Sequence, residues 1–83
     1  MSKWIEKDNA LIREFTFSDF KEAWSFMSDC ALVAEQQNHH PNWSNVYNKV
    51  HIELSTHDAG NIVTDKDRKL ADRIDEIFKK HST

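Results

Sequence analysis

Four of the five histidines lie close together in the sequence, between two segments that we expect to be helical. They are His39, His40, His51 and His57. An imidazole ring changes its protonation state near neutral pH, so several rings around one substrate can supply both an acid and a base. His39, His40 and His57 fall in predicted loops, where functional groups usually lie, whereas His51 falls within a predicted strand. The cluster indicates proton-transfer chemistry; the alternative is that these are surface residues without a role.

Metal binding is a second interpretation of a histidine cluster, and the spacing disfavours it. The sequence contains neither C-x-x-C nor H-E-x-x-H. Neighbouring side chains of an extended backbone point in opposite directions, so His39 and His40 cannot easily reach one ion. The sequence also lacks the nucleophile motif G-x-S-x-G and a glycine-rich phosphate loop. Cys30, the single cysteine, lies among apolar residues and is expected in the core. We therefore expect no metal site.

Composition narrows the class of protein. The chain has 83 residues, 39% of them hydrophobic, so we expect a single domain over residues 1–83. Acidic residues outnumber basic ones by 14 to 11, which argues against nucleic acid as a partner. No apolar run reaches the ~20 residues of a membrane span, and the N-terminus is too charged for a signal peptide. Because one cysteine cannot form an internal disulfide, we expect a reducing, cytoplasmic location.

The first 17 residues predict a small antiparallel hairpin. Trp4 and Ile5 begin a short apolar patch that ends at the turn-prone pair Asp8-Asn9. Residues 11–17 then alternate in polarity, with Phe15 and Phe17 on the face that we expect to be buried.

Residues 19–37 predict a helix with Ser18 as its N-cap. One apolar stripe lies beside a second, and together they form a face wider than one small sheet needs. We therefore expect the helix to cover the sheet with one stripe and a partner subunit with the other, giving a homodimer or homotetramer. The alternative is a helix buried deeply in its own domain. The first stripe is Phe20, Trp24, Met27, Ala31 and Ala34, and the second is Phe26, Cys30 and Val33.

Residues 43–55 alternate again and predict either one long strand or a hairpin that turns near Asn48-Lys49. A closing amphipathic helix follows, with Thr64 as its N-cap and Asp67 at its third position, a short-armed variant of the capping box. Its apolar stripe is Leu70, Ala71, Ile74, Ile77 and Phe78. The order β-β-α-β-β-α predicts an α+β fold: an antiparallel sheet of three to four strands with helices on one face.

Four segments together resemble the pterin-4a-carbinolamine dehydratase family. Residues 35–43 match E-x-x-x-H-H-P-x-W, residues 46–50 match V-Y-N-x-V, residues 54–58 read L-S-T-H-D, and residues 67–71 match D-x-x-L-A. The segments occur in the family's order and at compatible spacing, and the likeness covers nearly the whole chain. Family members commonly carry a further helix ahead of the Trp4 strand, and from these 83 residues we expect none here.

The resemblance implies the reaction: dehydration of 4a-hydroxytetrahydropterin to quinonoid dihydropterin, which recycles the cofactor of aromatic amino acid hydroxylases. It implies no metal or organic cofactor. Loss of the 4a-hydroxyl needs an acid for the leaving oxygen and a base for the N5 proton. Our hypothesis makes His40 and His57 the acid/base pair, in either order. His39 helps to bind the substrate or to shuttle protons.

Further site residues follow from the same matches. Asn38, Ser55, Thr56 and Asp58 match positions at which the family contacts its substrate. Glu35 is expected to orient a histidine, with a solvated helix end as the alternative.

Two more candidates have structural alternatives. Trp43 is either a stacking wall for the pterin or a packing anchor. Asp67 matches the family's aspartate, and capping of the last helix explains it equally well.

The resemblance also implies a second class of function. Members of the family act as dimerisation partners of a transcription factor through the long helix. The wide apolar stripe at residues 19–37 suits a non-catalytic binding module of this kind. The complete histidine set favours the enzyme, because a binding module does not need three histidines in two loops.

Overall fold

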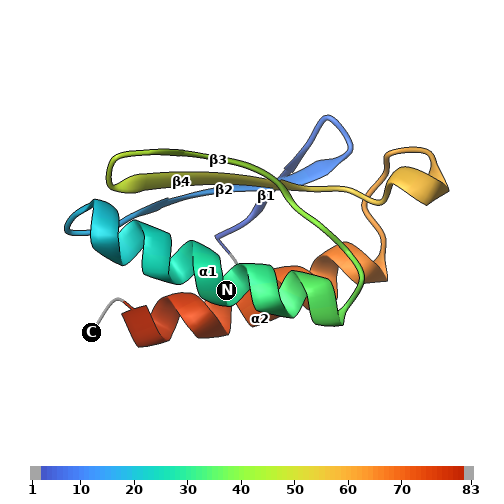
Figure 1. The fold of residues 1–83 in the computed structure, drawn as a ribbon. Coiled ribbons are helices and arrows are strands. Elements are labelled where there is room, and N and C mark those ends of the chain that lie inside the picture. Colours follow the sequence, from blue (N-terminus) through green and yellow to red (C-terminus); the bar gives the residue numbers. More distant parts are fainter. Residues whose placement is uncertain (1–2, 82–83) are drawn as a thin grey trace.

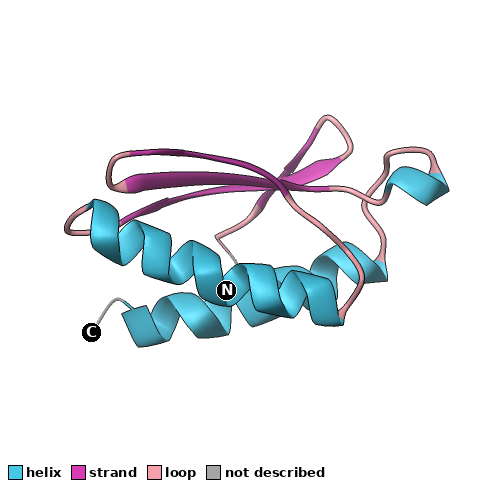
Figure 2. Ribbon diagram, viewed as in Figure 1, coloured by secondary structure: helices cyan, strands magenta, loops and turns pink. Residues whose placement is uncertain are grey.

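The computed structural model describes residues 3–81 as a sheet laid over two helices (Figure 1). The sheet is antiparallel and has the strand order β1-β2-β4-β3. Both helices cover the same face of it, as Figure 2 shows. The elements are β1 (Ile5–Lys7), β2 (Ala10–Thr16), α1 (Phe20–Gln36), β3 (Asn42–Val46), β4 (Lys49–Leu54), the short 3-10 helix η1 (His57–Ala59) and α2 (Asp65–His81). The predicted fold class and element order are confirmed.

Two tight turns build the sheet. The β1–β2 turn is at Asp8-Asn9, where both residues have positive φ angles of 52° and 63°, which these two residue types tolerate well. Residues 43–55 form a hairpin and not one strand, with its turn at Tyr47-Asn48. The Asn48 side-chain amide donates to the Phe17 carbonyl oxygen at 2.9 Å and so ties this turn to the end of β2.

Helix α1 differs from the prediction at its first residue. Asp19, and not Ser18, is the N-cap: its backbone is extended and its carboxylate accepts a hydrogen bond from the Glu22 backbone N–H at 2.9 Å. A carboxylate at this place also interacts favourably with the positive end of the helix dipole. The prediction of Ser18 was therefore wrong by one residue.

The two predicted stripes of α1 divide differently in the structure. The second stripe, Phe26, Cys30 and Val33, is buried in full, and Ala23 extends it by one turn. The first stripe splits. Met27 and Ala34 are buried, whereas Phe20, Trp24 and Ala31 lie on the exposed side. The helix therefore packs one apolar face against the core and exposes a second apolar face to solvent.

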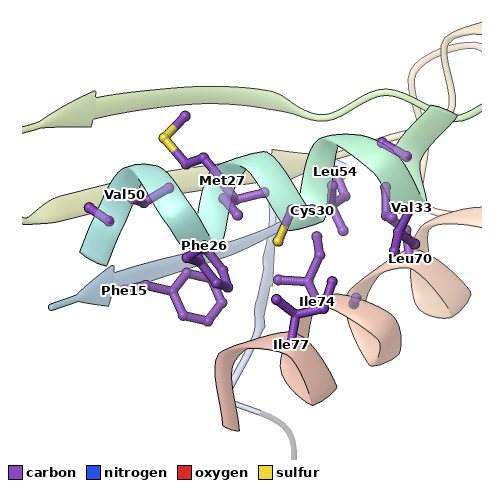
Figure 3. Close-up of a cluster of buried hydrophobic side chains, with 14 of the residues drawn as sticks. Phe15, Phe26, Met27, Cys30, Val33, Val50, Leu54, Leu70, Ile74 and Ile77 are labelled. Atoms are coloured by element: carbon purple, nitrogen blue, oxygen red, sulfur yellow. The ribbon is translucent and has the colours of Figure 1, made fainter. Parts of the chain in front are cut away.

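The core lies between the sheet and the helices. Figure 3 shows Phe15 of β2, Phe26 of α1 and Ile74 of α2 directed into it from three elements. Alternate residues of β4 point the same way, because side chains of a strand alternate between its two faces. These are Val50, Ile52 and Leu54, each no more than 1% exposed.

Burial also settles the chemistry of Cys30. Its side chain lies in the core. Burial raises the pKa of the thiol to about 12, and the nearby negative charge of Asp29 contributes a smaller part of this increase. A thiol is a nucleophile only as the thiolate. Cys30 is therefore inert at neutral pH, as expected of a core residue.

Candidate active site

A pocket of about 280 Å³ opens where three segments meet: the end of α1, the loop after β4 with η1, and the first turn of α2. It brings His39, His40 and His57 together, although 17 residues separate the last two in the sequence. Among the described residues that line it, Lys66 carries the one fixed positive charge and Asp58 the one acidic group. The lining residues are Asn38, His39, His40, Ser55, Thr56, His57, Asp58 and Lys66.

The C-terminal end of α1 directs the first two histidines into the pocket. Asn38 has a positive φ of 51°, and its N–H donates to the Glu35 carbonyl oxygen at 3.1 Å. The N–H of His39 reaches back to the Ala34 carbonyl oxygen at 3.0 Å. This pair of bonds is a Schellman motif, and asparagine is the commonest non-glycine residue at its left-handed position. The sequence N-H-H-P therefore reverses the chain and presents both imidazoles at the helix end.

The third histidine lies on a closed loop. The Thr56 N–H donates to the Ile62 carbonyl oxygen at 2.8 Å, and the Asn61 N–H donates back to the Thr56 carbonyl oxygen at 3.0 Å. Gly60 takes a φ of 91°, a conformation that favours glycine, and its N–H closes the turn on the His57 carbonyl oxygen at 3.0 Å. The loop is anchored at both ends, so His57 is held at the pocket edge.

His39 contacts a buried carboxylate. Its Nε2 lies 2.5 Å from Oδ1 of Asp67, and the two side chains are 10% and 0% exposed. The other oxygen, Oδ2, accepts a hydrogen bond from the Thr56 hydroxyl and one from the Thr64 N–H, both at 2.8 Å. An ionised carboxylate only accepts hydrogen bonds, so His39 must donate from Nε2. Its other nitrogen, Nδ1, has no hydrogen-bond partner in the part of the chain that the structure describes.

The other two imidazoles also have one ring nitrogen engaged. His40 Nε2 lies 2.8 Å from a carboxylate oxygen of Glu35, in a pair whose side chains are 61% and 79% exposed. His57 Nδ1 lies 3.0 Å from the side-chain oxygen of Asn61. Each partner atom is an acceptor, so each ring donates there, and within residues 3–81 its second nitrogen has no hydrogen-bond partner. Of the three, His39 has the best-shielded partner.

The structure places some predicted residues outside the pocket. Trp43 packs against the core and does not line the pocket, so the packing-anchor interpretation is the one that the structure supports. Glu35 contacts His40, and Asp67 lies beneath the pocket behind His39. His51 lies on the sheet beside Glu53, at 3.0 Å.

Three residues near the site were missed by the sequence analysis. Lys66 lines the pocket, Asn61 contacts His57, and the Thr64 hydroxyl contacts that of Thr56. Thr64 had been predicted as a helix N-cap, and it is the last residue before α2. A side chain in that position also lies beside the third residue of the helix, here Asp67, so the capping pattern was a signal from which the contact between Thr64 and the site could have been predicted.

No helix within residues 3–81 is long and apolar enough to cross a membrane. Within the same residues, no group of three or more histidine, cysteine or acidic side chains is placed to hold a metal ion.

Comparison with known proteins shows the family to which the chain belongs. Residues 1–77 match the family model described as pterin 4 alpha carbinolamine dehydratase. A Prochlorococcus marinus protein provisionally named pterin-4-alpha-carbinolamine dehydratase is 58% identical over 77 residues, 93% of this chain and 79% of that protein. A Bradyrhizobium protein with the same provisional name is 53% identical over 79 residues, again covering 93% and 79%.

Two solved structures are also similar. The transcriptional coactivator/pterin dehydratase of Brucella melitensis has a TM-score of 0.85 and 43% identity, covering 89% of this chain and 80% of its own. A pterin dehydratase-like protein identified as a RuBisCO assembly factor of the alpha-carboxysome has a TM-score of 0.77 and 24% identity, covering 92% and 89%, and shares the fold. With a family model that spans most of its length and relatives above 50% identity, the chain belongs to the pterin 4 alpha carbinolamine dehydratase family.

Proposed function

We propose that this protein dehydrates 4a-hydroxytetrahydropterins to quinonoid dihydropterins. The observation that carries the proposal is the pocket with three imidazoles, each bonded through one nitrogen to an acceptor and each with the other nitrogen free. Such rings can give or take a proton near neutral pH without a metal or an organic cofactor. Family membership supports the same substrate class.

The reaction needs two proton transfers and nothing else. The bond between C4a and the hydroxyl oxygen breaks while an acid protonates that oxygen, which leaves as water. A base removes the proton from N5, and the N5 electron pair forms the double bond to C4a. The electrons balance without an oxidant, so a site built from imidazoles and hydrogen-bonding side chains supplies what the chemistry requires.

The contacts favour a division of labour among the histidines. His39 is the base, because the buried Asp67 stabilises the positive charge that the ring gains with a proton. His57 is the acid in its doubly protonated form: Nδ1–H stays on the Asn61 oxygen, and the proton on Nε2 goes to the leaving hydroxyl oxygen. His40 is paired with Glu35, and both side chains are well exposed. An exposed pair orients a side chain only weakly, so we assign His40 to substrate binding. This arrangement differs from the sequence-based hypothesis, in which His40 and not His39 formed the pair with His57.

The remaining pocket residues bind the substrate. Asn38, Ser55 and Asp58 line the pocket and offer donors and acceptors for the amide and amino edge of a pterin. We further propose that aromatic amino acid hydroxylases supply the carbinolamine, and that the protein acts in the cytoplasm, where the buried thiol of Cys30 stays reduced.

A spectrophotometric assay tests the function. An aromatic amino acid hydroxylase generates the 4a-carbinolamine in the cuvette, and its decay is followed with increasing amounts of this protein. We expect decay to accelerate in proportion to the protein added. A folded protein that leaves the uncatalysed rate unchanged would exclude the dehydratase and leave a binding module as the function.

The exposed face of α1 favours a second property, self-association. Phe20 and Trp24 are 49% and 57% exposed, and their rings stack with centroids 6.3 Å apart. Ala31 continues this exposed side two turns further along the helix. Exposed aromatic groups of this kind are enriched at protein interfaces. We propose that α1 joins copies of this chain into a homodimer or homotetramer, and the same face would serve a non-catalytic binding module.

Replacing Trp24 with glutamate tests the proposed interface. A charge in an apolar interface is costly, so we expect Trp24→Glu to shift the protein from oligomer to monomer in sedimentation velocity. Lys21→Glu, on the same helix and also exposed, is the control that changes charge without removing an aromatic ring. A wild-type protein that stays monomeric at about 100 µM, far above the usual dissociation constant of a specific dimer, would refute the proposal.

A further inference from the structure

The hydroxyl of Thr56 has no proton left to donate to a substrate, although Thr56 lines the pocket and matches a substrate-contact position. The residue is 5% exposed. Its oxygen lies 2.8 Å from Asp67 Oδ2 and 2.5 Å from the hydroxyl oxygen of Thr64. A hydroxyl has one proton to donate and two lone pairs. The Thr56 hydroxyl therefore gives its proton to a partner within the protein and uses one lone pair on another.

The direction of every hydrogen bond in this cluster follows from its members. The carboxylate of Asp67 can only accept, so the Thr56 hydroxyl gives it its proton. Thr64 must then donate to Thr56, because Thr56 has no second proton. The Thr64 oxygen in turn accepts from the backbone N–H of Lys66 at 3.3 Å. The result is a one-way chain of donors that ends on Asp67, joined there by the Thr64 backbone N–H at 2.8 Å.

These hydrogen bonds leave one carboxylate oxygen of Asp67 for His39. Oδ2 of Asp67 is occupied by Thr56 and Thr64, so the imidazole takes Oδ1. Two bonds to Oδ2 also prevent the carboxylate from rotating, which fixes the line along which the ring must donate. Among the described residues, none forms a hydrogen bond with His39 Nδ1. The tautomer with the proton on Nε2 is thereby selected.

We propose that Thr56 and Thr64 are positioning residues: their hydroxyls hold the Asp67 carboxylate, and through it they fix the His39 ring with Nε2–H on Asp67 and Nδ1 turned to the substrate. The effect on catalysis rests on the proposed function, whereas the effect on the tautomer does not. Neither hydroxyl touches the substrate in this arrangement, so their loss should alter turnover and not substrate affinity.

Thr56→Val tests the proposal, because valine keeps the shape and removes the hydroxyl. We expect kcat to fall about tenfold, as is usual when the group that orients a histidine is lost, with KM within about twofold of wild type. Thr56→Ser restores the hydroxyl and should restore kcat. Thr16→Val, an exposed threonine at the end of β2, is the matched control and should leave both constants unchanged.

Nitrogen-15 NMR of the imidazoles reads the tautomer directly and needs no activity. At a pH where the ring is neutral, wild-type His39 should show the proton on Nε2. In Thr56→Val the Nδ1–H form should appear alongside it. If Thr56→Val is poorly folded by circular dichroism, Thr64→Val breaks the same chain one bond further from Asp67 and should change the tautomer in the same direction.

Three results would overturn the proposal. The first is an unchanged His39 tautomer in folded Thr56→Val and Thr64→Val. The second is a rise in KM at constant kcat, which would make Thr56 a substrate contact. The third is a Thr56→Ser variant as slow as Thr56→Val. If wild type itself proves inactive, the proposed function fails and the NMR result alone decides the positioning role.

Discussion

Replacing His39 or His57 with alanine is expected to lower kcat for dehydration by about 10²–10⁴-fold, the usual contribution of a general acid or base. Both rings line the pocket, and each has one nitrogen free for proton transfer. His39→Ala also removes the partner of a buried carboxylate oxygen, so His39→Gln, which keeps a donor near Asp67, should accompany it. Stopped-flow measurement of carbinolamine decay gives the rates.

His51→Ala is the matched control for the histidine variants. His51 lies on the sheet and outside the pocket, in contact with Glu53, so its removal should leave kcat within about twofold of wild type. His40→Ala should raise KM more than it lowers kcat, because we assign this ring to binding. Wild-type rates in both His39→Ala and His57→Ala would show that the pocket is not the catalytic site.

Replacing Leu70 with alanine is expected to lower the free energy of unfolding by about 2–5 kcal/mol. Leu70 lies in α2, is fully buried, and belongs to the core cluster that joins the two helices to the sheet. The loss combines the transfer free energy of the removed atoms with the cavity that they leave. A chain of 83 residues has a small stability to lose, so Tm should fall by at least about 8 °C.

Leu32→Ala is the control for that substitution, because it makes the same chemical change in the other helix. Leu32 is 66% exposed, so we expect its loss to cost less than about 1 kcal/mol. The difference in helix propensity between leucine and alanine is the same in both variants and cancels. Differential scanning calorimetry at two protein concentrations separates core packing from any effect of self-association. Equal losses in both variants would contradict the assigned core.

Periodicity predicted the elements well because burial has one dominant direction in each of them. In β4, Val50, Ile52 and Leu54 alternate with polar residues, and the sheet buries one parity. In α2, apolar residues recur every three to four positions, and these are the ones that face the core.

Periodicity could not predict the structure where two different structures have the same pattern of apolar residues. A two-residue turn preserves alternation, so the hairpin at Tyr47-Asn48 could not be distinguished from a long strand. In α1 apolar residues occupy two faces, and periodicity alone cannot say which face meets the core. The structure turns Phe26 inward and Trp24 outward because only one face can pack against both the sheet and α2.

Residue types by themselves were enough to predict a candidate site. Histidines in loops flanking the strands predicted His39, His40 and His57 as site residues, and the order of the surrounding motifs, through the family resemblance, suggested the proposed reaction. This prediction is possible because few side chains other than histidine titrate near neutral pH, so a cluster of histidines in the sequence by itself indicates proton-transfer chemistry.

Only the tertiary structure decided how those histidines differ. His39 and Asp67 are 28 residues apart in the sequence, and no local rule predicts that a helix end and the first turn of another helix will share a buried contact. Packing of α1 against α2 brings them together. The carboxylate is shielded from water there, so its hydrogen bonds to Thr56, Thr64 and His39 are strong and specific. The sequence determined which side chains could transfer protons, and long-range packing decided which imidazole has a buried carboxylate as its partner.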